Sequence, residues 1–397
     1  MIRAAFVNHH TGFGGAEMML LTLLERLDRA RVAPVLMTPG EGVLTEGARD
    51  LGVEVRVVPV APSLLGVTRG GAGSTLGSAV ALAHLPAAAV RHARAIRAAG
   101  ADVVVTNSAK AHVYGSLAGR LARRPVVWRM HDTMDSADFA GSTRRLLLAV
   151  GRRIPARILT VTDATGRVLV AGGVPPERVT TLYNGIDLAA LRADAARAAR
   201  RDGAPRVGSD GRITPLKGHA VVIEAAARLQ ERGVDARFVI AGAPSHEAPG
   251  HLEELRERAE RLGVGERVEL ISPFPDLAEV LSSLDVMVSA SVLPDSLPTT
   301  VIASMALGVP VVASELGGGP ELVRDDETGI VVPPNDAGRI ADAVAALIAA
   351  PERRAAYGRA ASEDATARFD VDDFADAFAG HLERASQMRA AGLFRAR

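Results

Sequence analysis

Short apolar runs alternate along the first half of this chain with longer segments whose apolar residues recur at helical spacing. Short runs that are apolar at nearly every position are typical of strands buried on both faces. The strands predicted in this half are residues 2–7, 32–37, 53–58, 103–106, 126–129, 158–161 and 179–183, and the principal helices are residues 16–27, 78–99, 111–123 and 143–150. Strands that alternate with helices predict a parallel sheet with right-handed crossovers.

The second half of the chain repeats this alternation. Its predicted strands are residues 206–207, 237–241, 267–271, 284–288, 310–313 and 329–332, and its helices are residues 220–231, 251–262, 276–284, 337–349, 352–366 and 371–390, with one more that starts at Pro298. We therefore expect an α/β fold of two doubly wound domains. The expected divisions are a first domain at 1–187, a linker at 188–204, a second domain at 205–366 and a C-terminal helix at 367–397 that packs back toward the first domain.

Composition narrows the class of protein. The 397 residues fit two or three domains of about 100 to 200 residues each. The net charge of zero argues against nucleic acid as a partner, and the absence of cysteine excludes disulfides and thiolate metal sites. The N-terminal apolar run is too short for a signal peptide, and no apolar stretch reaches the roughly 18 residues that a membrane helix needs. We expect a cytoplasmic protein.

Several loops that follow predicted strands have the composition of anion sites. Gly14 and Gly15 follow the first strand, although they do not form a GxGxxG motif. The loops after residues 284–288 and 310–313 each lead into a helix, and helix N-termini favour anions. Arg212 and Lys217 lie five residues apart in a glycine-containing loop before another helix, where they could hold a diphosphate or form a solvated surface pair. Lys217 and Lys110 are the only lysines among 46 basic residues.

The order of these motifs resembles that of the retaining GT-B glycosyltransferases of family four. The resemblance is carried by Gly14-Gly15-Ala16-Glu17, Trp128-Arg129-Met130-His131-Asp132, Asn184-Gly185-Ile186-Asp187, the glycine, arginine and lysine-glycine loop of residues 208–219, and the segments 305–312 and 317–321. It covers nearly the whole chain in the family's order. It implies a GT-B fold, in which two Rossmann-like domains face each other across a cleft.

The resemblance also implies a function. A hexosyltransferase of this kind moves a sugar from a nucleotide-diphosphate sugar to an acceptor with retention of configuration and needs no metal or other cofactor. A UDP-sugar is favoured over a GDP-sugar, and the acceptor, which the sequence does not name, would be a glycan, a lipid or a natural product. In catalysis Arg212 and Lys217 would neutralise the departing diphosphate, His131 would contact the donor sugar, and Asp295 would reach the transferred sugar.

Other positions match the family's donor-binding residues. Gly14 and Gly15 would let the backbone approach the diphosphate, and Ser272 and Phe274 would lie against the nucleotide base. The remaining donor-binding positions are Asn184, Ser296, Leu297, Thr299, Thr300 and Ala303.

Ala303 departs from the family pattern. The family has a glutamate there, which holds the ribose of the nucleotide, and its absence removes acceptors for two hydroxyl groups. A catalytically weakened nucleotide-sugar-binding protein of the same fold is therefore an alternative function. A sugar-nucleotide epimerase with a GT-B fold is another, although it needs an acid and base pair that we cannot locate in the sequence.

Two further patterns have simple alternatives. Asp370-Val371-Asp372-Asp373 matches an Asp-x-Asp metal motif, but it lies at a predicted helix start and is better explained by capping. Arginines at 144, 145, 152, 153 and 157 surround the apolar residues 146–150, a pattern that fits either a peripheral contact with the inner face of the membrane or a solvated helix face.

Overall fold

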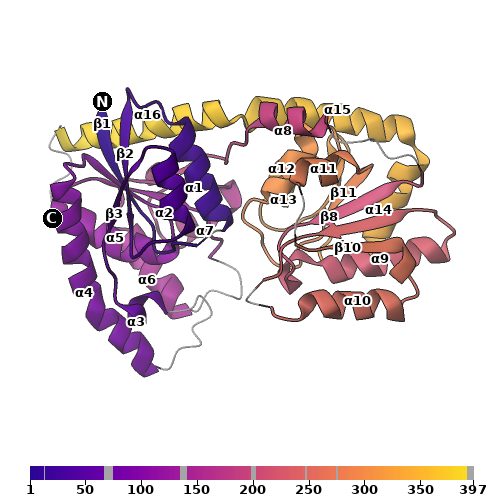
Figure 1. The fold of residues 1–397 in the computed structure, drawn as a ribbon, viewed down its shortest axis with the longest axis horizontal. Helices are drawn as coiled ribbons and strands as arrows, with labels where there is room; N and C mark the ends of the chain where they lie inside the picture. Colours follow the sequence, from indigo (N-terminus) through magenta and orange to yellow (C-terminus); the bar gives the residue numbers. More distant parts are fainter. Residues whose placement is uncertain are drawn as a thin grey trace. The chain divides into compact units, whose positions relative to one another are not determined.

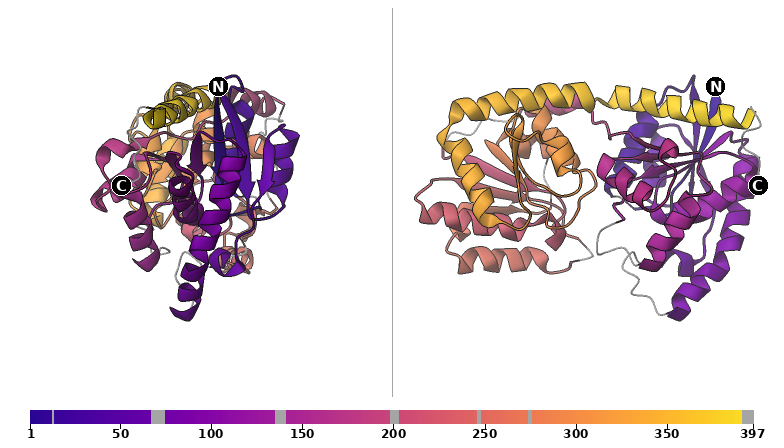
Figure 2. Two further views of the ribbon diagram at one scale, coloured as in Figure 1. Left: turned by 90° about the vertical axis from the view of Figure 1, so that its left-hand side faces the viewer. Right: turned by 180° about the vertical axis from the view of Figure 1, so that it is seen from behind.

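The computed structural model describes residues 1–12, 14–66, 75–134, 141–197, 203–245, 248–273 and 276–390. The chain divides into two compact units, and each is described here by itself. Unit 1 contains residues 1–185 together with the C-terminal segment from Val371, and unit 2 contains Ile186–Asp370. Each unit is built around one parallel sheet with helices on both faces (Figures 1 and 2), which confirms the predicted α/β class.

The sheet of unit 1 has seven parallel strands in the order β3-β2-β1-β4-β5-β6-β7. They are β1 Ile2–Val7, β2 Val32–Thr38, β3 Glu54–Val57, β4 Val103–Thr106, β5 Val126–Met130, β6 Arg157–Thr160 and β7 Val179–Thr181. The helices are α1 Gly15–Arg26, α2 Val43–Asp50, α3 Pro62–Leu65, α4 Thr75–Ala98, α5 Ala109–Ala122, α6 Gly141–Gly151, α7 Asp163–Ala171 and α16 Val371–Ala390. The strand order reverses between β1 and β4, where ligands bind in doubly wound sheets.

Strand β1 shows why the apolar runs are continuous. Ala4 and Phe6 point into a core formed with α1, α2 and α16, whereas Ala5 and Val7 point into a second core formed with α4, α5 and α6. Successive side chains of a strand point to opposite faces, so both sets must be apolar when helices cover both faces.

The C-terminal helix α16 belongs to unit 1 (Figure 2). Phe378 is fully buried and its ring lies 6.3 Å from that of Phe6. Arg31 pairs with Glu383 at 2.9 Å and also with Asp376. Burial of an aromatic side chain contributes roughly 1.5–3 kcal/mol, so the helix is an integral part of this domain.

Unit 2 has a six-stranded parallel sheet in the order β10-β9-β8-β11-β12-β13. Its strands are β8 Arg206–Asp210, β9 Arg237–Ala241, β10 Val268–Ile271, β11 Val286–Ser289, β12 Val311–Ser314 and β13 Gly329–Val332. Its helices are α8 Leu188–Ala195, α9 His219–Glu231, α10 His251–Arg261, α11 Leu277–Ser282, α12 Thr299–Ala306, α13 Gly319–Leu322, α14 Ala337–Ala349 and α15 Pro351–Arg368, with a short 3₁₀ turn, η2, at Pro215–Lys217.

Three expectations differ from the structure. Residues 188–195, expected as a helical turn within a linker, form helix α8 of unit 2, because Asp187 caps the helix and α8 packs against α11 and α12. The strand expected at 206–207 continues to Asp210, because polar Ser209 and Asp210 occupy buried positions that the apolar pattern did not reveal. Helices α2, α3 and α7 were not predicted, because they are only 8, 4 and 9 residues long and give little helical periodicity.

Most of the apolar residues that suggested a membrane contact for α6 are buried. Leu147, Leu148 and Val150 are buried in the core of unit 1 and do not form an exposed face. Arg145 on α6 is exposed, as are Arg152 and Arg153 directly after the helix, which fits a solvated surface. Within the described ranges, no helix is both long and apolar enough to cross a membrane.

Candidate active site

The loop after β8 is held in place against the end of β11. Gly218 has a φ of +69°, and a Cβ there would lie 1.9 Å from the carbonyl oxygen of Ala290, so only glycine allows this approach. The Val292 amide donates to the Leu216 carbonyl at 2.9 Å. These backbone contacts fix η2 and therefore the position of Lys217.

The loops after β11 and β12 are fixed to each other in the same way. The Gly318 amide donates to the Asp295 carbonyl at 2.8 Å. Gly317 has a φ of +58°, and a Cβ there would lie 2.1 Å from that same oxygen. The glycines of this turn therefore position Asp295 rather than merely reversing the chain.

These loops bring Lys217 and Asp295 together. The Lys217 ammonium donates to Oδ2 of Asp295 at 2.6 Å, and the two side chains are 16% and 17% exposed. The sequence predicted a diphosphate role for the lysine and a sugar role for the aspartate, and the structure adds that they form one ion pair. Partial burial limits solvent screening, so the pair is stronger than a surface ion pair.

Asp210 is a third charged residue at this site, and the sequence analysis missed it. It ends β8, is 7% exposed, and among the described residues neither carboxylate oxygen makes a hydrogen bond of normal geometry, with the Thr300 side chain as its nearest hydrogen-bonding group. Burial raises the pKa of Asp210 to about 6, against the opposing effects of the Thr300 side chain and the Lys217 ammonium. The available signal was an acidic residue directly before the Gly211-Arg212 pair, where the strand was expected to have ended already.

His219 supports the backbone of the Arg212 loop. Its Nδ1 lies 3.2 Å from the Ser209 hydroxyl and its Nε2 lies 3.3 Å from the Arg212 carbonyl oxygen. Burial lowers the pKa of His219 to about 4, so the imidazole is neutral near pH 7. The side chain of Arg212 itself is exposed.

Helix α12 begins beside this cluster. Pro298 is its N-cap, so the amides of Thr299 and Thr300 belong to the first turn, where backbone N–H groups have no acceptor within the helix. Both threonines are half-buried, whereas Leu297 is buried and Ser296 is half-buried. The first turn therefore presents donors beside Lys217 and Asp210 that suit an anion.

Ala303 lies one turn further along α12 and is 2% exposed. Its neighbour Ser304 donates its hydroxyl to the Thr300 carbonyl at 2.9 Å. That hydroxyl is therefore engaged within the helix and does not replace the missing carboxylate. Of the two residues expected beside the nucleotide base, Ser272 is half-buried and Phe274 lies outside the described residues.

His131 follows β5 in unit 1, at the edge of the sheet where Asn8 follows β1 and Asn107 follows β4. His131 Nε2 lies 3.0 Å from the side-chain oxygen of Asn107. Burial and, secondly, the Arg129 charge hold the pKa of His131 well below its usual value, so the ring is neutral. The Asn8 amide donates to Oε1 of Glu17 at 3.1 Å. This set lies in unit 1, whereas Lys217, Asp295 and Asp210 lie in unit 2.

The two glycines of the first loop differ. A Cβ at Gly14 would lie 2.8 Å from Oε2 of Glu17, at the end of a side chain that can shift, so packing alone does not require glycine there. A Cβ at Gly15 would have no atom within 4 Å, which leaves open space beside the backbone.

Asn184 has a structural partner. Arg129 donates to its side-chain oxygen, and also to the Leu182 carbonyl at 2.6 Å, and the guanidinium carbon lies 5.2 Å from the centre of the Phe374 ring. Arg129 is 2% exposed, so these contacts compensate a buried cation. Asn184 therefore already has a role inside unit 1 that its assignment to donor binding did not foresee.

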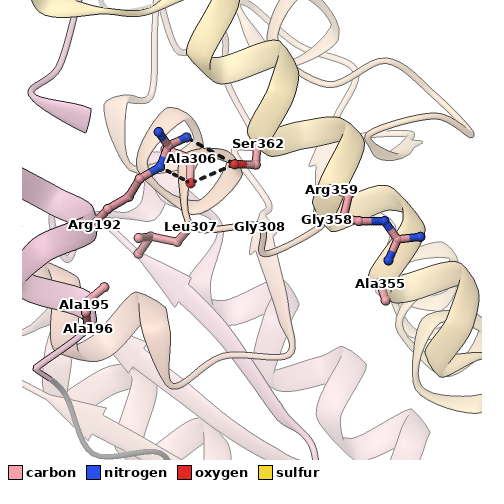
Figure 3. A pocket seen from close by; sticks show the side chains of 10 residues that line it. All are labelled: Arg192, Ala195, Ala196, Ala306, Leu307, Gly308, Ala355, Gly358, Arg359 and Ser362. Atoms are coloured by element: carbon pink, nitrogen blue, oxygen red, sulfur yellow. Dashed lines mark hydrogen bonds between the residues drawn. The ribbon is translucent and has the colours of Figure 1, made fainter. Parts of the chain in front are cut away.

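A separate groove in unit 2 contains none of the predicted site residues (Figure 3). Arg192 crosses it and donates to the Ala306 carbonyl and to the Ser362 hydroxyl, each at 3.2 Å, and to the Thr366 hydroxyl at 2.7 Å. These bonds join α8, α12 and α15, which gives the groove a structural explanation. Among the described residues, no cluster of three or more metal-ligating side chains occurs, at Asp370–Asp373 or elsewhere.

Family models of glycosyltransferases match both halves of the chain. Residues 13–190 match the family described as Glycosyltransferase Family 4, and residues 192–364 match Glycosyl transferases group 1. D-inositol 3-phosphate glycosyltransferases from Mycolicibacterium paratuberculosis and Mycobacterium avium are each 34% identical over 237 residues. These matches cover 58% of this chain and 53% and 55% of the relatives, so the chain spans about half the length of the curated relatives it matches.

Solved structures share the fold over nearly the whole chain. HepE of Anabaena in complex with UDP has a TM-score of 0.80 at 22% identity, with 96% of this chain and 100% of that chain covered. A glycosyltransferase from Rickettsia africae has a TM-score of 0.81 at 16% identity, with 97% and 98% covered. The chain therefore has the GT-B fold, and its residues 13–190 and 192–364 match the family models described as Glycosyltransferase Family 4 and Glycosyl transferases group 1.

Proposed function

We propose that this protein is a retaining glycosyltransferase that transfers a sugar from a nucleotide-diphosphate sugar to an acceptor hydroxyl. The observation that carries the proposal is the Lys217–Asp295 pair beside the first turn of α12. A cation, backbone donors and a carboxylate are what a site needs to bind a diphosphate and the hydroxyl groups of its sugar. The proposal includes a cytoplasmic location, which the lack of cysteine favours.

In the proposed reaction the bond between the anomeric carbon and the diphosphate oxygen breaks, and the acceptor oxygen bonds to the same face of that carbon. Lys217 and Arg212 stabilise the negative charge that develops on the diphosphate, and the acceptor proton passes to the departing phosphate oxygen. Asp295 accepts hydrogen bonds from the sugar, and the family resemblance assigns a further sugar contact to His131. Because the two basic residues neutralise the diphosphate, we propose that no divalent metal is required.

UDP-sugars are the first donors to test, because HepE of Anabaena has been crystallised with UDP-glucose. Inositol 3-phosphate is the first acceptor to test, because the curated relatives are named for it. A cell extract that contains glycans and lipids supplies the remaining acceptor classes. The weakened binding protein stays as the second candidate, because Ala303 lacks the carboxylate expected there.

The deciding experiment measures free UDP released from UDP-sugars with and without acceptor. We expect release that depends on acceptor, a product whose anomeric configuration by NMR matches that of the donor, and a rate unchanged by excess EDTA. Donor binding without release would favour the binding protein, and conversion of the donor sugar without acceptor would favour the epimerase. Loss of activity in EDTA that magnesium restores would contradict metal independence.

Replacing Asp295 by asparagine is expected to change binding and turnover in opposite directions. The ammonium of Lys217 is paired with Asp295 in the structure, so a diphosphate must compete with that carboxylate. The amide releases the lysine, and UDP should bind on the order of 10-fold more tightly, equivalent to about 1.4 kcal/mol. Turnover should fall by about 100-fold or more, because the carboxylate no longer orients the sugar.

Calorimetry with UDP and steady-state kinetics check the two halves of this prediction. Asp342→Asn is the matched control, since Asp342 pairs with Arg232 at 2.7 Å with side chains 51% and 45% exposed, and its loss should alter neither quantity. UDP affinity that falls in Asp295→Asn would show that Asp295 does not compete for Lys217.

A further inference from the structure

Asp210 is a buried carboxylate whose surroundings do not satisfy it. It lies at the carboxyl end of β8, 7% exposed, and neither of its oxygens makes a hydrogen bond of normal geometry among the described residues, although the Thr300 side chain is near enough to favour the ionised form as a hydrogen-bonding group. Buried polar groups in proteins are nearly always hydrogen-bonded, so an exception beside a candidate site requires an explanation. The proposed chemistry does not use this side chain.

The carboxylates at this site outnumber the partly buried cation beside them. Lys217 on η2 is paired with Asp295 from the loop after β11, and its ammonium also acts on Asp210. Two carboxylates therefore share one partly buried ammonium. Of the other titratable groups, Arg212 is exposed, and His219 at the start of α9 is neutral near pH 7 because its pKa is about 4.

A bound diphosphate would change this balance. The diphosphate would form an ion pair with the Lys217 ammonium. It would lie beside the first turn of α12, next to Thr300, whose side chain lowers the pKa of Asp210. An ionised Asp210 would then be a buried anion without a partner facing a second anion, and both burial and like charge favour the protonated form.

Resting on the proposed function, we propose that Asp210 is a further donor-binding residue that takes up one proton from solvent when the nucleotide-diphosphate sugar binds to Lys217. The proton adds to a carboxylate oxygen, and the resulting neutral acid has an O–H group that donates a hydrogen bond to a phosphate oxygen. Before the donor binds, the pKa of Asp210 is about 6. Protonating this carboxylate at pH 7 therefore costs little free energy, and the requirement weakens donor binding only about tenfold.

The test measures protons taken up by the full chain when UDP-glucose binds. UDP-glucose is the probe because its esterified diphosphate does not titrate near pH 7, whereas the terminal phosphate of UDP does. Calorimetric titrations at pH 7 in buffers of different ionisation enthalpy should give an uptake on the order of 0.8 proton per site. The Kd should rise up to about 10-fold per pH unit between pH 7 and pH 8.5.

Asp210→Asn is the matched variant, because the amide has the shape of the protonated acid and cannot titrate. It should bind UDP-glucose with no proton uptake and with a Kd that does not change with pH. Asp295→Asn should keep both the uptake and the pH dependence, which separates Asp210 from its neighbour. If the asparagine variant does not fold, as judged by its melting curve, Asp210→Ser replaces it with the same expected result.

Each outcome decides the proposal. Proton uptake in the natural protein that disappears in the Asp210 variant supports it. Binding without uptake, or uptake that the variant retains, overturns it and leaves the proposed transferase intact. Failure of every UDP-, GDP- and dTDP-sugar to bind at all would overturn the proposed function, and this inference with it.

Discussion

Replacing Lys217 by alanine is expected to lower turnover by about 100-fold or more while leaving the fold intact. The ammonium would act on charge that develops on the diphosphate in the transition state, and loss of one such contact typically costs two to three orders of magnitude. The structure strengthens the expectation, because the variant leaves Asp295 and Asp210 facing the donor without a cation between them. Donor binding should weaken together with turnover.

The fold should tolerate this change, because the side chain belongs to a loop turn whose position is set by backbone contacts at Gly218 and Val292. Arg232→Ala is the matched control, since it also removes a cation from unit 2 but one that is 45% exposed and paired with Asp342. Arg212→Ala should act in the same direction as Lys217→Ala. Unchanged kinetics in Lys217→Ala would remove this loop from the proposed mechanism.

The sequence predicted the sheet residues well because their periodicity has a direct physical cause. A strand such as β1 is covered by helices on both faces, so every position is apolar and the run is easily recognised. Strand β8 was predicted too short because its end is not apolar. Its last residues, Ser209 and Asp210, are polar and buried, and Ser209 is compensated by His219, which is ten residues away in the sequence.

The site residues, too, could be predicted only in part from the sequence. The resemblance pointed to Lys217 and Asp295 separately, but their 2.6 Å pairing depends on loops that follow different strands, and no spacing along the chain encodes it. Asp210 could have been suspected only as an unexplained acid before Gly211, because its lack of partners is a property of the packed domain. Asn184 was found through its motif, whereas the hydrogen bond that it accepts from Arg129 is seen only in the structure.

Ala303 remains the position where the chain departs from the family pattern, and the structure sharpens what a carboxylate there would do. Side chains on a helix lie over the turn that precedes them, so a glutamate at 303 would extend toward Thr299 and Thr300. Both threonines are half-buried, whereas Ala303 itself is 2% exposed, so the carboxylate would have to extend past the threonines to reach a ligand. Ser304 offers no substitute, because its hydroxyl is bonded to the Thr300 carbonyl at 2.9 Å.

Ala303→Glu is therefore expected to tighten UDP binding by about 10- to 100-fold, equivalent to roughly 1 to 3 kcal/mol for restored hydrogen bonds to a charged group. Calorimetry on the two proteins measures the gain, and 2′-deoxy-UDP is the control ligand. The natural protein should discriminate weakly between the two nucleotides, because alanine cannot hold the ribose hydroxyls. The glutamate variant should lose most of its gain with 2′-deoxy-UDP, because one of the two hydroxyls is missing. Unchanged or weaker UDP binding in a variant that melts normally would mean that the nucleotide pocket is arranged differently around Ala303, and the assignment of this end of the site would be wrong.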